Sequence, residues 1–361
     1  MTSDSGRELT VVGAGGVGGV VGAHLARAGH RVRFLETNLD HVEAIRERGL
    51  HLSGRVDFTV RVPVQPPDAV SGDLDLVLLA VKAKDTETAM SVVAPRLRPG
   101  GCVVSLQNGL EEHEIARWVG AHRTVGAFLT FGASYASPGE VVYGGPGSFR
   151  LGELDGRRTD RVERLAETLT AAFHPVEVTD NIFGFLWGKA ALGAYYFATA
   201  LVDEDVPRIL DRLEYRPLFG RLVAEVVRVA QAEGVRCEVI DGFDPLAFVG
   251  DGDTEPSWQA QYHYWALHVQ RRTGVWRDLA LHRRATEVDH IIGPVIARAK
   301  ARGVAVPLLR HLRQLIKEAE AGRRGLSFAN LEELMAAEVE DVGSRHGPDP
   351  AQTTGRGSAP G

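Results

Sequence analysis

Short apolar runs alternate with segments of helical periodicity through the first half of the chain. Most of the runs carry no polar interruption, which is typical of parallel strands buried on both faces. The predicted strands are residues 9–12, 31–35, 75–81, 102–106 and 176–178, and the predicted helices are residues 17–28, 40–48, 86–97 and 159–173. This alternation indicates an α/β domain in which helices cover both faces of a mostly parallel sheet.

The remaining patterns divide the chain further. Residues 51–64 and 124–153 predict short strands with proline and glycine turns, and we expect the later ones to complete the same sheet. Asp180 is predicted to cap the first helix of a helical domain. Its helices are predicted at residues 182–200, 204–233, 257–282, 286–302 and 307–321. We therefore predict an N-terminal tail (1–8), a Rossmann NAD(P)-binding domain (9–180), a helical substrate and dimerisation domain (181–340) and a disordered tail (341–361).

Three glycines follow the first predicted strand at dinucleotide-binding spacing: Gly13, Gly15 and Gly18. In such a turn the first glycine bends the chain, the second lets the backbone approach a pyrophosphate, and the third lets helix and strand pack closely. The phosphates would lie over the free amides and the positive dipole of the following helix. The predicted phosphate site is Gly13, Ala14, Gly15, Gly16, Val17 and Gly18.

Glu36 stands at the end of the second predicted strand, followed by Thr37. An acidic side chain at this place can accept hydrogen bonds from both ribose hydroxyls and repels a 2′-phosphate. We therefore expect Glu36 and Thr37 to belong to the cofactor site, and we expect NAD(H) to be favoured over NADP(H). Arg31 and Arg33 leave NADP(H) open, because either guanidinium could reach a phosphate.

Two polar residues follow the ends of two other predicted strands. Lys82 ends the strand at 75–81, and Asn108 follows the strand at 102–106. Ligands of open parallel sheets gather outside the carboxyl ends of the strands. Lys82 and Asn108 are therefore expected beside the glycine turn.

Composition excludes several classes of protein. Of 361 residues, 44% are hydrophobic and 24% charged, and the net charge of -6 comes with no basic block, so we expect no nucleic-acid partner. No run approaches the ~18 apolar residues that span a bilayer. Residues 1–8 are polar, so we expect no membrane association and a cytoplasmic location. Cys102 and Cys237 show no metal-binding spacing, and we expect reduced thiols and no metal.

Five motifs together resemble the ketopantoate reductase (2-dehydropantoate 2-reductase) family. They are GAGGVG at Gly13, VK at Lys82, QNG at Asn108, WGK at Lys189 and TEVD around Glu287. The resemblance implies an NAD(P)-dependent oxidoreductase that reduces a 2-oxo acid to the 2-hydroxy acid in a cleft between two domains. It implies a Rossmann domain followed by an all-α domain like the C-terminal domain of 6-phosphogluconate dehydrogenase, with a possible homodimer.

The resemblance also implies roles for single residues. Lys189 would be the general acid that protonates the carbonyl oxygen as hydride arrives, and Glu287 would orient Lys189 and the substrate. Asn108 would lie on the nicotinamide side of the cleft and Lys82 near the cofactor. An ammonium suits this task, because it can stabilise and protonate the alkoxide that hydride addition creates. Apolar neighbours of Lys189 would lower its pKa, and a paired carboxylate would oppose that shift.

Each of these residues also has a structural interpretation. Lys189 could be a helix-end lysine that reaches solvent, and Glu287 could be a first-turn acid favoured by the helix dipole. Asn108 could form an ordinary turn with Gly109, and Lys82 could be a solvated residue at a strand end.

Departures from the family bear on the substrate. The catalytic lysine is usually followed at i+4 and i+8 by two asparagines that reach the substrate, and here these positions are Gly193 and Phe197. The segment TGVWRDL, with Trp276 and Arg277, replaces the usual polar serine segment before the TE motif. Each lost polar partner should cost a small hydroxylated acid about 1 to 3 kcal/mol of discrimination. We expect a bulkier or more apolar substrate, contacted by Asn108, Gly193, Phe197, Trp276 and Arg277.

The stretch 258–276 adds a cluster of aromatic and histidine side chains that could shape the pocket, pack in the core or form a subunit interface. Its members are Trp258, Tyr262, His263, Tyr264, Trp265, His268 and Trp276. A substrate carboxylate could be bound there by Arg271, Arg272 or Arg277.

Two classes of function remain. The first is a nicotinamide-dependent oxidoreductase acting on a 2-oxo acid, with opine-type imine reduction or secondary-alcohol oxidation as alternatives. The second is a cofactor-binding sensor or partner subunit without turnover, which the two lost asparagines favour. The retained Lys189 and Glu287 argue for the enzyme, because a sensor needs no proton donor.

Overall fold

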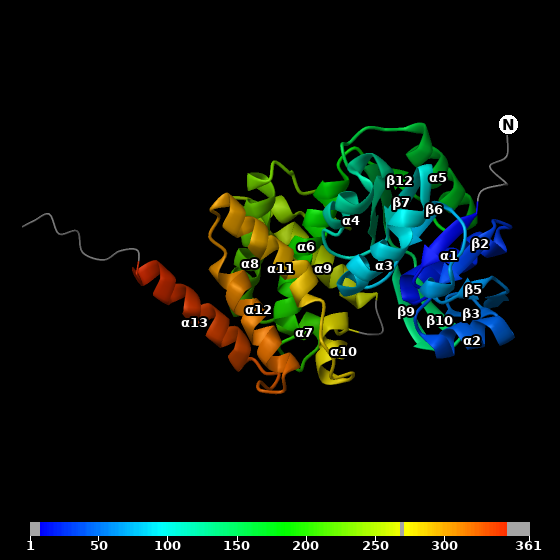
Figure 1. The fold of residues 1–361 in the computed structure, drawn as a ribbon. Helices are drawn as coiled ribbons and strands as arrows, with labels where there is room; N and C mark the ends of the chain where they lie inside the picture. The colour runs from blue at the N-terminus through cyan, green and yellow to red at the C-terminus, as the bar shows by residue number, and fades with distance from the viewer. Residues whose placement is uncertain (1–7, 268–270, 345–361) are drawn as a thin grey trace, which may run out of the picture.

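The computed structural model describes residues 8–267 and 271–344. Two domains lie side by side: elements of the first half of the chain form the right-hand domain in Figure 1, and helices of the second half form the left-hand one. The last helix, α13 (Ala329–Ser344), continues to Ser344, inside the segment predicted as a disordered tail. The rest of that tail lies outside the described residues, as do residues 1–7 of the predicted N-terminal tail and His268.

The first domain is built on an eight-stranded sheet of order β12-β11-β8-β7-β6-β1-β2-β5. Neighbouring strands are parallel except β8 and β11. At the centre, the fully buried Val11 is paired with Phe34 on one side and Leu78 on the other. The strands are β1 (Leu9–Val12), β2 (Val32–Leu35), β5 (Val64–Gln65), β6 (Leu74–Leu79), β7 (Leu97–Ser105), β8 (Thr124–Leu129), β11 (Phe149–Glu153) and β12 (Glu177–Val178). The predicted Rossmann-type architecture is confirmed.

Helices connect the strands largely where helical periodicity predicts them. They are α1 (Gly16–Arg27), α2 (Leu39–Arg48), α3 (Thr86–Val93), α5 (Asp160–Ala172) and the unpredicted α4 (Glu112–Val119). Because β7, β6 and β1 are neighbours in the sheet, the residues after their carboxyl ends share one edge. That edge carries Asn108, Lys82 and Gly13.

A second sheet corrects the prediction that the strands in 124–153 all complete the main sheet. It has the order β4-β3-β10-β9, with β3 (Leu50–Gly54), β4 (Phe58–Val60), β9 (Gly132–Ser137) and β10 (Glu140–Gly145). The physical reason is that β8 is already paired on both edges, with β7 and β11. The hairpin after it therefore pairs with β3 and packs on α1, where Val141 lies against Gly19.

The second domain is helical, as predicted, but two predicted helices are broken. The segment 204–233 is split between Leu210 and Arg216, where Pro217 suits the first turn of a new helix. The segment 257–282 is split before Gly274, and the Thr273 side chain caps the second part by accepting a hydrogen bond from the Trp276 N–H. The helices are α6 (Ile182–Thr199), α7 (Val206–Leu210), α8 (Arg216–Ala232), α9 (Glu255–Ala266), α10 (Gly274–Ala280), α11 (Val288–Arg302), α12 (Pro307–Glu320) and α13.

The first helix of this domain is capped one residue later than predicted. Asn181, not Asp180, accepts a hydrogen bond from Gly184 N–H, and its amide also donates to Arg236 O and Glu238 Oε1. The Asn181 amide, unlike a carboxylate, can both accept and donate, so it is fixed from two directions, whereas Asp180 is exposed. The domain boundary at 180 stays a prediction.

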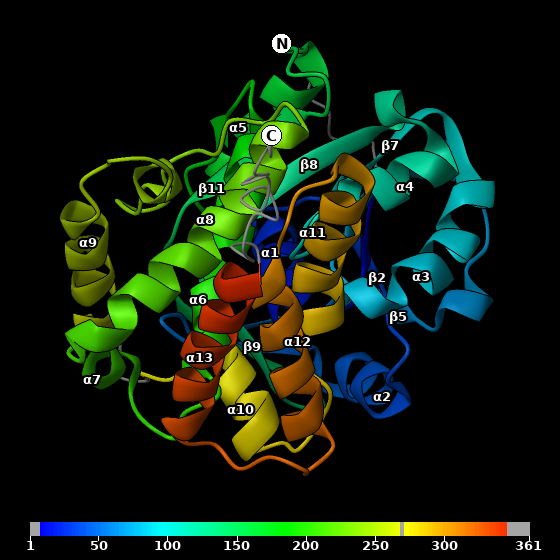
Figure 2. The ribbon, with the colours of Figure 1, turned by 90° about the vertical axis from the view of Figure 1, so that its left-hand side faces the viewer.

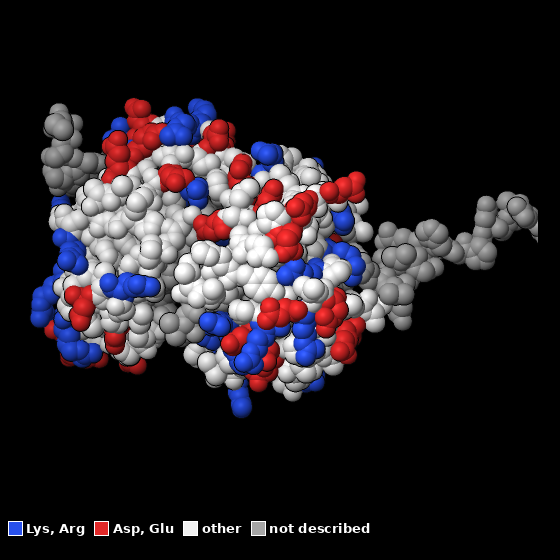
Figure 3. All heavy atoms as spheres, turned by 180° about the vertical axis from the view of Figure 1, so that it is seen from behind, with Lys and Arg blue, Asp and Glu red and all other residues white. Residues whose placement is uncertain are grey.

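The helix α6 forms the centre of the helical core. Trp187, Tyr195 and Phe197 are among its fully buried side chains, and α8 packs along it. Figure 2 looks onto this domain, with α12 and α13 in front of the sheet. In Figure 3, seen from behind, basic and acidic side chains are interspersed over the surface. None of the described helices is both long and apolar enough to cross a membrane.

Candidate active site

Four residues that the motifs single out meet where the two domains face each other. Lys189, from α6, donates hydrogen bonds from Nζ to Asn108 Oδ1 at 2.8 Å and to Leu129 O at 2.6 Å. Lys82 Nζ, after β6, lies 2.7 Å from Glu287 Oε2, at the start of α11. Both contacts join the Rossmann domain to the helical domain, so these residues form the walls of one interdomain site.

The Lys189 side chain is half-buried at the junction of the two domains. Its Nζ lies 5.8 Å from the centre of the Phe128 ring, and Gly188 and Ala190 beside it are buried. Burial lowers the pKa of Lys189 to about 8, although the charges of Glu287, Asp241 and Glu112 oppose the shift in that order. An ammonium with this pKa can both hold and release a proton near neutral pH.

Glu287 contacts Lys82 rather than Lys189. The Lys82 side chain is 54% exposed and that of Glu287 21%, so solvent screens this ion pair on the lysine side. Glu287 still has the largest opposing effect on the pKa of Lys189. Its influence on Lys189 is therefore through its charge, since no hydrogen bond joins the two among the described residues.

The glycine turn fits a dinucleotide phosphate. Gly13 has φ +94°, and a Cβ on Gly18 would lie 2.0 Å from Gly13 O, so neither position accepts a side chain. By contrast, a Cβ on Gly15 would meet no atom within 4 Å, so the backbone faces open space there. No side chain caps α1 at Gly15, which leaves its first amides free to bind phosphate oxygens.

Glu36 is bound to the glycine turn itself. Its Oε2 accepts a hydrogen bond from Ala14 N–H at 2.7 Å, and its Oε1 accepts one from Asn38 N–H at 2.9 Å. Thr37 Oγ1 lies 3.5 Å from Oε1 and is exposed. The carboxylate therefore stiffens the turn, and its contact with a ribose stays a prediction.

Two contacts of the turn were not predicted. The buried His41 accepts a hydrogen bond from Gly139 N–H at its Nδ1, so its Nε2 donates to Ala14 O at 3.0 Å. A Cβ on Gly16 would lie 2.8 Å from Ser134 N, so only glycine lets β9 pass this closely. No local pattern signals these contacts, because both depend on the second sheet.

Buried carboxyl groups beside Asn108 were also not predicted. Glu111 is 9% exposed and Glu112 is 0% exposed at the start of α4. Burial raises the pKa of Glu111, and it raises the pKa of Glu112 to about 8. Asp241, which influences Lys189, is exposed and accepts a hydrogen bond from Ser148 Oγ at 2.7 Å. Adjacent glutamates in sequence usually indicate a solvated helix face, so no local pattern predicts their burial.

The predicted substrate residues other than Asn108 lie on α6 and α10. Gly193 lies one turn after Lys189 on α6 and is partly exposed, and a Cβ there would meet only Ile291 Cγ2, at 3.8 Å. Phe197 is 1% exposed and packs in the helical core. Trp276 and Arg277 lie on α10, which packs on α6.

The aromatic stretch contributes mainly to the core. Trp258 and Trp265 are 3% and 5% exposed, and their rings contact Tyr195 and Tyr196 of α6. Both of these tyrosine hydroxyls donate to Gln261 Oε1, at 2.6 and 2.7 Å. Arg272 is held by Asp203 and Asp205, which leaves less of its charge for a substrate.

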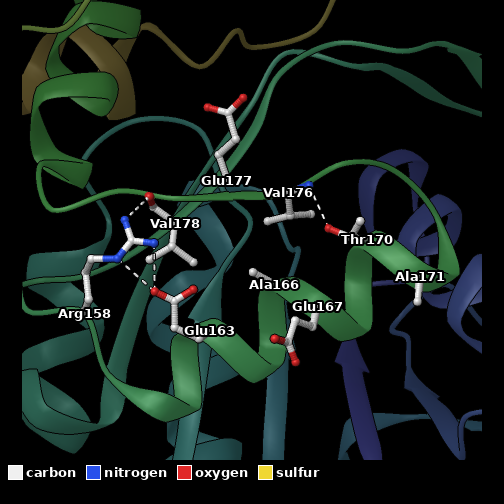
Figure 4. A pocket seen from close by; sticks show the side chains of 9 residues that line it. All are labelled: Arg158, Glu163, Ala166, Glu167, Thr170, Ala171, Val176, Glu177 and Val178. Atoms are coloured by element: carbon white, nitrogen blue, oxygen red, sulfur yellow. Dashed lines mark hydrogen bonds and ion pairs between the residues drawn. The ribbon is translucent and has the colours of Figure 1, made fainter.

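A hollow on the surface of the Rossmann domain lies away from these residues. A shallow hollow between α5 and β12 has Arg158 at one side, where Glu163 and the carbonyl of Val178 bind its guanidinium (Figure 4). The apolar side chains of Ala166 and Val176 also line this hollow. No group of three metal-ligating side chains is gathered anywhere in residues 8–267 and 271–344.

Two protein-family models match most of this chain. The model of ketopantoate reductase PanE/ApbA matches residues 9–156, and the model of its C-terminal part matches residues 181–320. The 2-dehydropantoate 2-reductase of Halobacterium salinarum is 31% identical over 317 residues, covering 86% of this chain and 98% of the relative.

Solved structures show the same architecture. A PanE/ApbA family ketopantoate reductase from Ralstonia eutropha JMP134 matches with a TM-score of 0.75 and 30% identity, covering 88% of this chain and 99% of its own. D-mandelate dehydrogenase with NADH and anilino(oxo)acetate shares the fold, with a TM-score of 0.77, 22% identity and the same coverage. The chain belongs to the ketopantoate reductase family. It is therefore an NAD(P)-dependent oxidoreductase of the type that reduces a 2-keto acid.

Proposed function

We propose that this protein reduces a 2-oxo acid larger or more apolar than ketopantoate, with Lys189 as the general acid. The observation that carries the proposal is the half-buried Lys189 ammonium, which reaches from the helical domain to Asn108 Oδ1 and Leu129 O of the Rossmann domain. Its pKa of about 8 keeps it protonated at neutral pH and lets it lose the proton without a large penalty.

A bound reduced nicotinamide supplies the hydride. The turn from Gly13 to Gly18 would hold the phosphates, and Glu36 with Thr37 would contact the adenosine ribose. Lys189 would stabilise the oxygen of the substrate carbonyl as negative charge develops, and would then transfer its proton to that oxygen. Asn108 would keep the ammonium directed toward this oxygen, and Glu287 would favour its charged form.

We propose NAD(H) as the preferred cofactor. The two oxygens of Glu36 accept backbone hydrogen bonds, so its negative charge is fixed beside the expected ribose position. A 2′-phosphate would meet that charge at close range, which is unfavourable in a partly desolvated site. Thr37, in the position where the family usually has arginine, offers no compensating cation.

The open space at Gly193 supports the proposal that the substrate is larger than ketopantoate. Where the family usually has an asparagine side chain, this chain leaves open space bounded by Ile291. A small hydroxylated acid would find no amide there, whereas an apolar group could fill the space and gain about 25 cal/mol per Å² of buried apolar surface. The D-mandelate dehydrogenase of the same fold was solved with an aryl oxo acid, anilino(oxo)acetate.

The test is turnover by the purified protein with NADH or NADPH and a panel of 2-oxo acids that includes ketopantoate and aryl oxo acids. We expect Lys189→Ala to abolish most turnover and to leave NADH affinity within about threefold, because Lys189 is not in the phosphate site. Lys300→Ala, at an exposed position on α11, is the matched control.

Other outcomes separate the alternatives. Turnover only with an imine or a secondary alcohol would replace the 2-oxo acid proposal by opine-type reduction or alcohol oxidation. Tight NADH binding without turnover of any carbonyl or imine would indicate a cofactor sensor. The molar mass of the purified protein by light scattering would decide whether it forms the homodimer that we propose through the helical domain.

A further inference from the structure

Glu112 is a buried carboxyl group for which the proposed reaction gives no role. It is the first residue of α4 and is 0% exposed. Neither carboxyl oxygen has a hydrogen-bond partner among the described residues. A carboxyl group in this setting is costly to ionise, so its charged form needs a positive charge nearby.

The contact between helix α6 and strand β8 places such a positive charge, that of Lys189, near Glu112. A Cβ on Gly126 of β8 would contact Ile182 of α6 and would lie 3.4 Å from Glu112 Cγ. Two residues further along the same face of β8, the Phe128 ring lies under Lys189 Nζ. Because Ile182 and Lys189 are seven residues apart on α6, they share one helix face. Glu112 and Lys189 therefore occupy neighbouring places along one α6–β8 contact.

We propose that Glu112 is a positioning residue that acts on Lys189 from inside the protein, on the side away from the cleft, and fixes its charge state. The inference rests on the proposed function of Lys189 as the general acid. Glu112 contributes no atom to the substrate site, because its side chain is sealed from solvent. It acts through charge: once ionised, it holds the proton on Lys189 at pH values where an isolated buried lysine would lose it.

The charges around the two groups agree with this role. Burial has the largest effect on the pKa of Glu112 and raises it, the backbone at the start of α4 and Ser105 lower it, and among charged groups Glu111 raises it and Lys189 lowers it. Lys189 is influenced by Glu287 before α11, by Asp241 after α8 and by Glu112. Glu287 and Asp241 are partly or fully open to solvent and can be screened. Glu112 is the buried member of the three, so its effect on Lys189 is the least sensitive to salt.

The experiment measures the pKa of Lys189 directly, by competitive acetylation at a series of pH values followed by mass spectrometry of the Lys189 peptide. This measurement needs no substrate. We expect Glu112→Gln to lower the pKa of Lys189 by roughly half a unit to one unit, because a carboxylate that favours the ammonium is removed. The high-pH limit of carbonyl reduction should move down by the same amount, with turnover near pH 6 within about threefold of the parent enzyme.

Three variants serve as controls. Glu111→Gln removes the adjacent carboxyl group, whose charge raises the pKa of Glu112, and so it should not lower the pKa of Lys189. Glu112→Asp keeps a carboxyl group and should retain most of the effect. Glu112→Leu should repeat the result of Glu112→Gln if the glutamine variant folds poorly, as judged by thermal unfolding.

An unchanged pKa of Lys189 in both Glu112→Gln and Glu112→Leu would overturn the inference. An equal shift in Glu111→Gln would also overturn it, because the effect would then be a general one of α4. If the shift is found but the parent enzyme turns over no carbonyl, the proposed function fails while the charge coupling stands. The two failures are therefore distinguishable.

Discussion

Lys189 and Asn108 meet across the two domains, with Nζ donating to Oδ1 at 2.8 Å. The same ammonium donates to the carbonyl of Leu129, so two neutral oxygens of the Rossmann domain hold it in place. Neutral acceptors fix the direction of an ammonium without neutralising it. This relationship explains how a buried lysine can remain available to a developing alkoxide.

Replacing Asn108 tests that relationship. Asn108→Ala should lower kcat for carbonyl reduction by about 10- to 100-fold, because the ammonium loses one of its two fixed acceptors. Asn108→Asp keeps the shape but adds a negative charge at Lys189 and should raise its pKa. The high-pH limit of kcat in a pH profile should therefore move upward in Asn108→Asp. An equal kcat for Asn108→Ala and the parent enzyme would show that Leu129 O suffices.

The pH dependence of the parent enzyme follows from Lys189. Its pKa is lowered to about 8, so the ammonium needed for reduction is present below that pH and is lost above it. The rate of carbonyl reduction should fall as pH rises through about 8, and alcohol oxidation, which needs the neutral amine, should rise over the same range. Initial rates in both directions from pH 6 to 10 check the sign. A reduction rate that is flat to pH 10 would contradict Lys189 as the proton donor.

Substitutions of Lys82 and Glu287 distinguish the effect of the Glu287 charge on Lys189 from the effect of the ion pair on stability. Because Lys82 is 54% exposed, breaking the pair with Lys82→Ala should change the free energy of unfolding by less than about 1 kcal/mol. Glu287→Gln should instead reduce kcat by about 10- to 100-fold and lower the pKa of Lys189, because Glu287 has the largest effect that opposes the burial of Lys189. Urea unfolding and pH profiles of both variants make the comparison. Matching losses of kcat would show that the ion pair, rather than Glu287, is needed.

Glu36 should affect the binding of both cofactors. Glu36→Ala removes the acceptor of the Ala14 N–H, so the glycine turn loses support and the affinity for NADH and NADPH alike should fall. The loss should be about tenfold or more for NADH, which also loses its ribose contact, and smaller for NADPH, which loses a repulsion. Thr37→Arg alone should improve NADPH while leaving the turn intact. Fluorescence titration with each cofactor measures these changes, and an unaltered NADH affinity in Glu36→Ala would exclude this role.

Much of the fold follows from local pattern. The strand, glycine turn, helix and second strand from Leu9 to Leu35 are each set by neighbours in sequence, and they lie as predicted. The separate sheet of β9 and β10 could not be read in this way, because it depends on which edges of β8 are already paired. The break after Leu210 has a local signal in Pro217, but the signal is weak within a long helical pattern.

Some residues of the candidate site could likewise be predicted from local pattern, and others could not. Asn108, Lys82 and Glu287 each stand at the end of an element near the domain junction, and Lys189, within α6, reaches Asn108 from the other domain. The positions of His41 and Glu112 depend on contacts between residues far apart in sequence, and so does the pairing of Glu287 with Lys82 rather than with Lys189. Phe197 shows the reverse case: its family position suggests a ligand contact, but its apolar ring is drawn into the helical core.

Gly193 offers the sharpest test of substrate size. A Cβ at this position would lie 3.8 Å from Ile291 Cγ2, an ordinary van der Waals contact, so Gly193→Asn should fold normally. On the same helix, a Cβ at Gly188 would lie 2.8 Å from Glu238 O, so Gly188→Ala is a matched control that should lose about 1 to 3 kcal/mol of stability. Thermal unfolding distinguishes the two positions.

The same Gly193→Asn variant should alter specificity. The new amide would place a hydrogen-bonding group where the family usually has one and would occupy the space left for an apolar substituent. The ratio of kcat/KM for ketopantoate to that for an aryl 2-oxo acid should therefore rise by about 10- to 100-fold, the effect of one well-placed polar contact of about 1 to 3 kcal/mol. Gly193→Ala fills the space without the amide, so it should lower the rate with the aryl acid without raising that with ketopantoate. A specificity ratio that does not change in Gly193→Asn would place the substrate away from this face of α6.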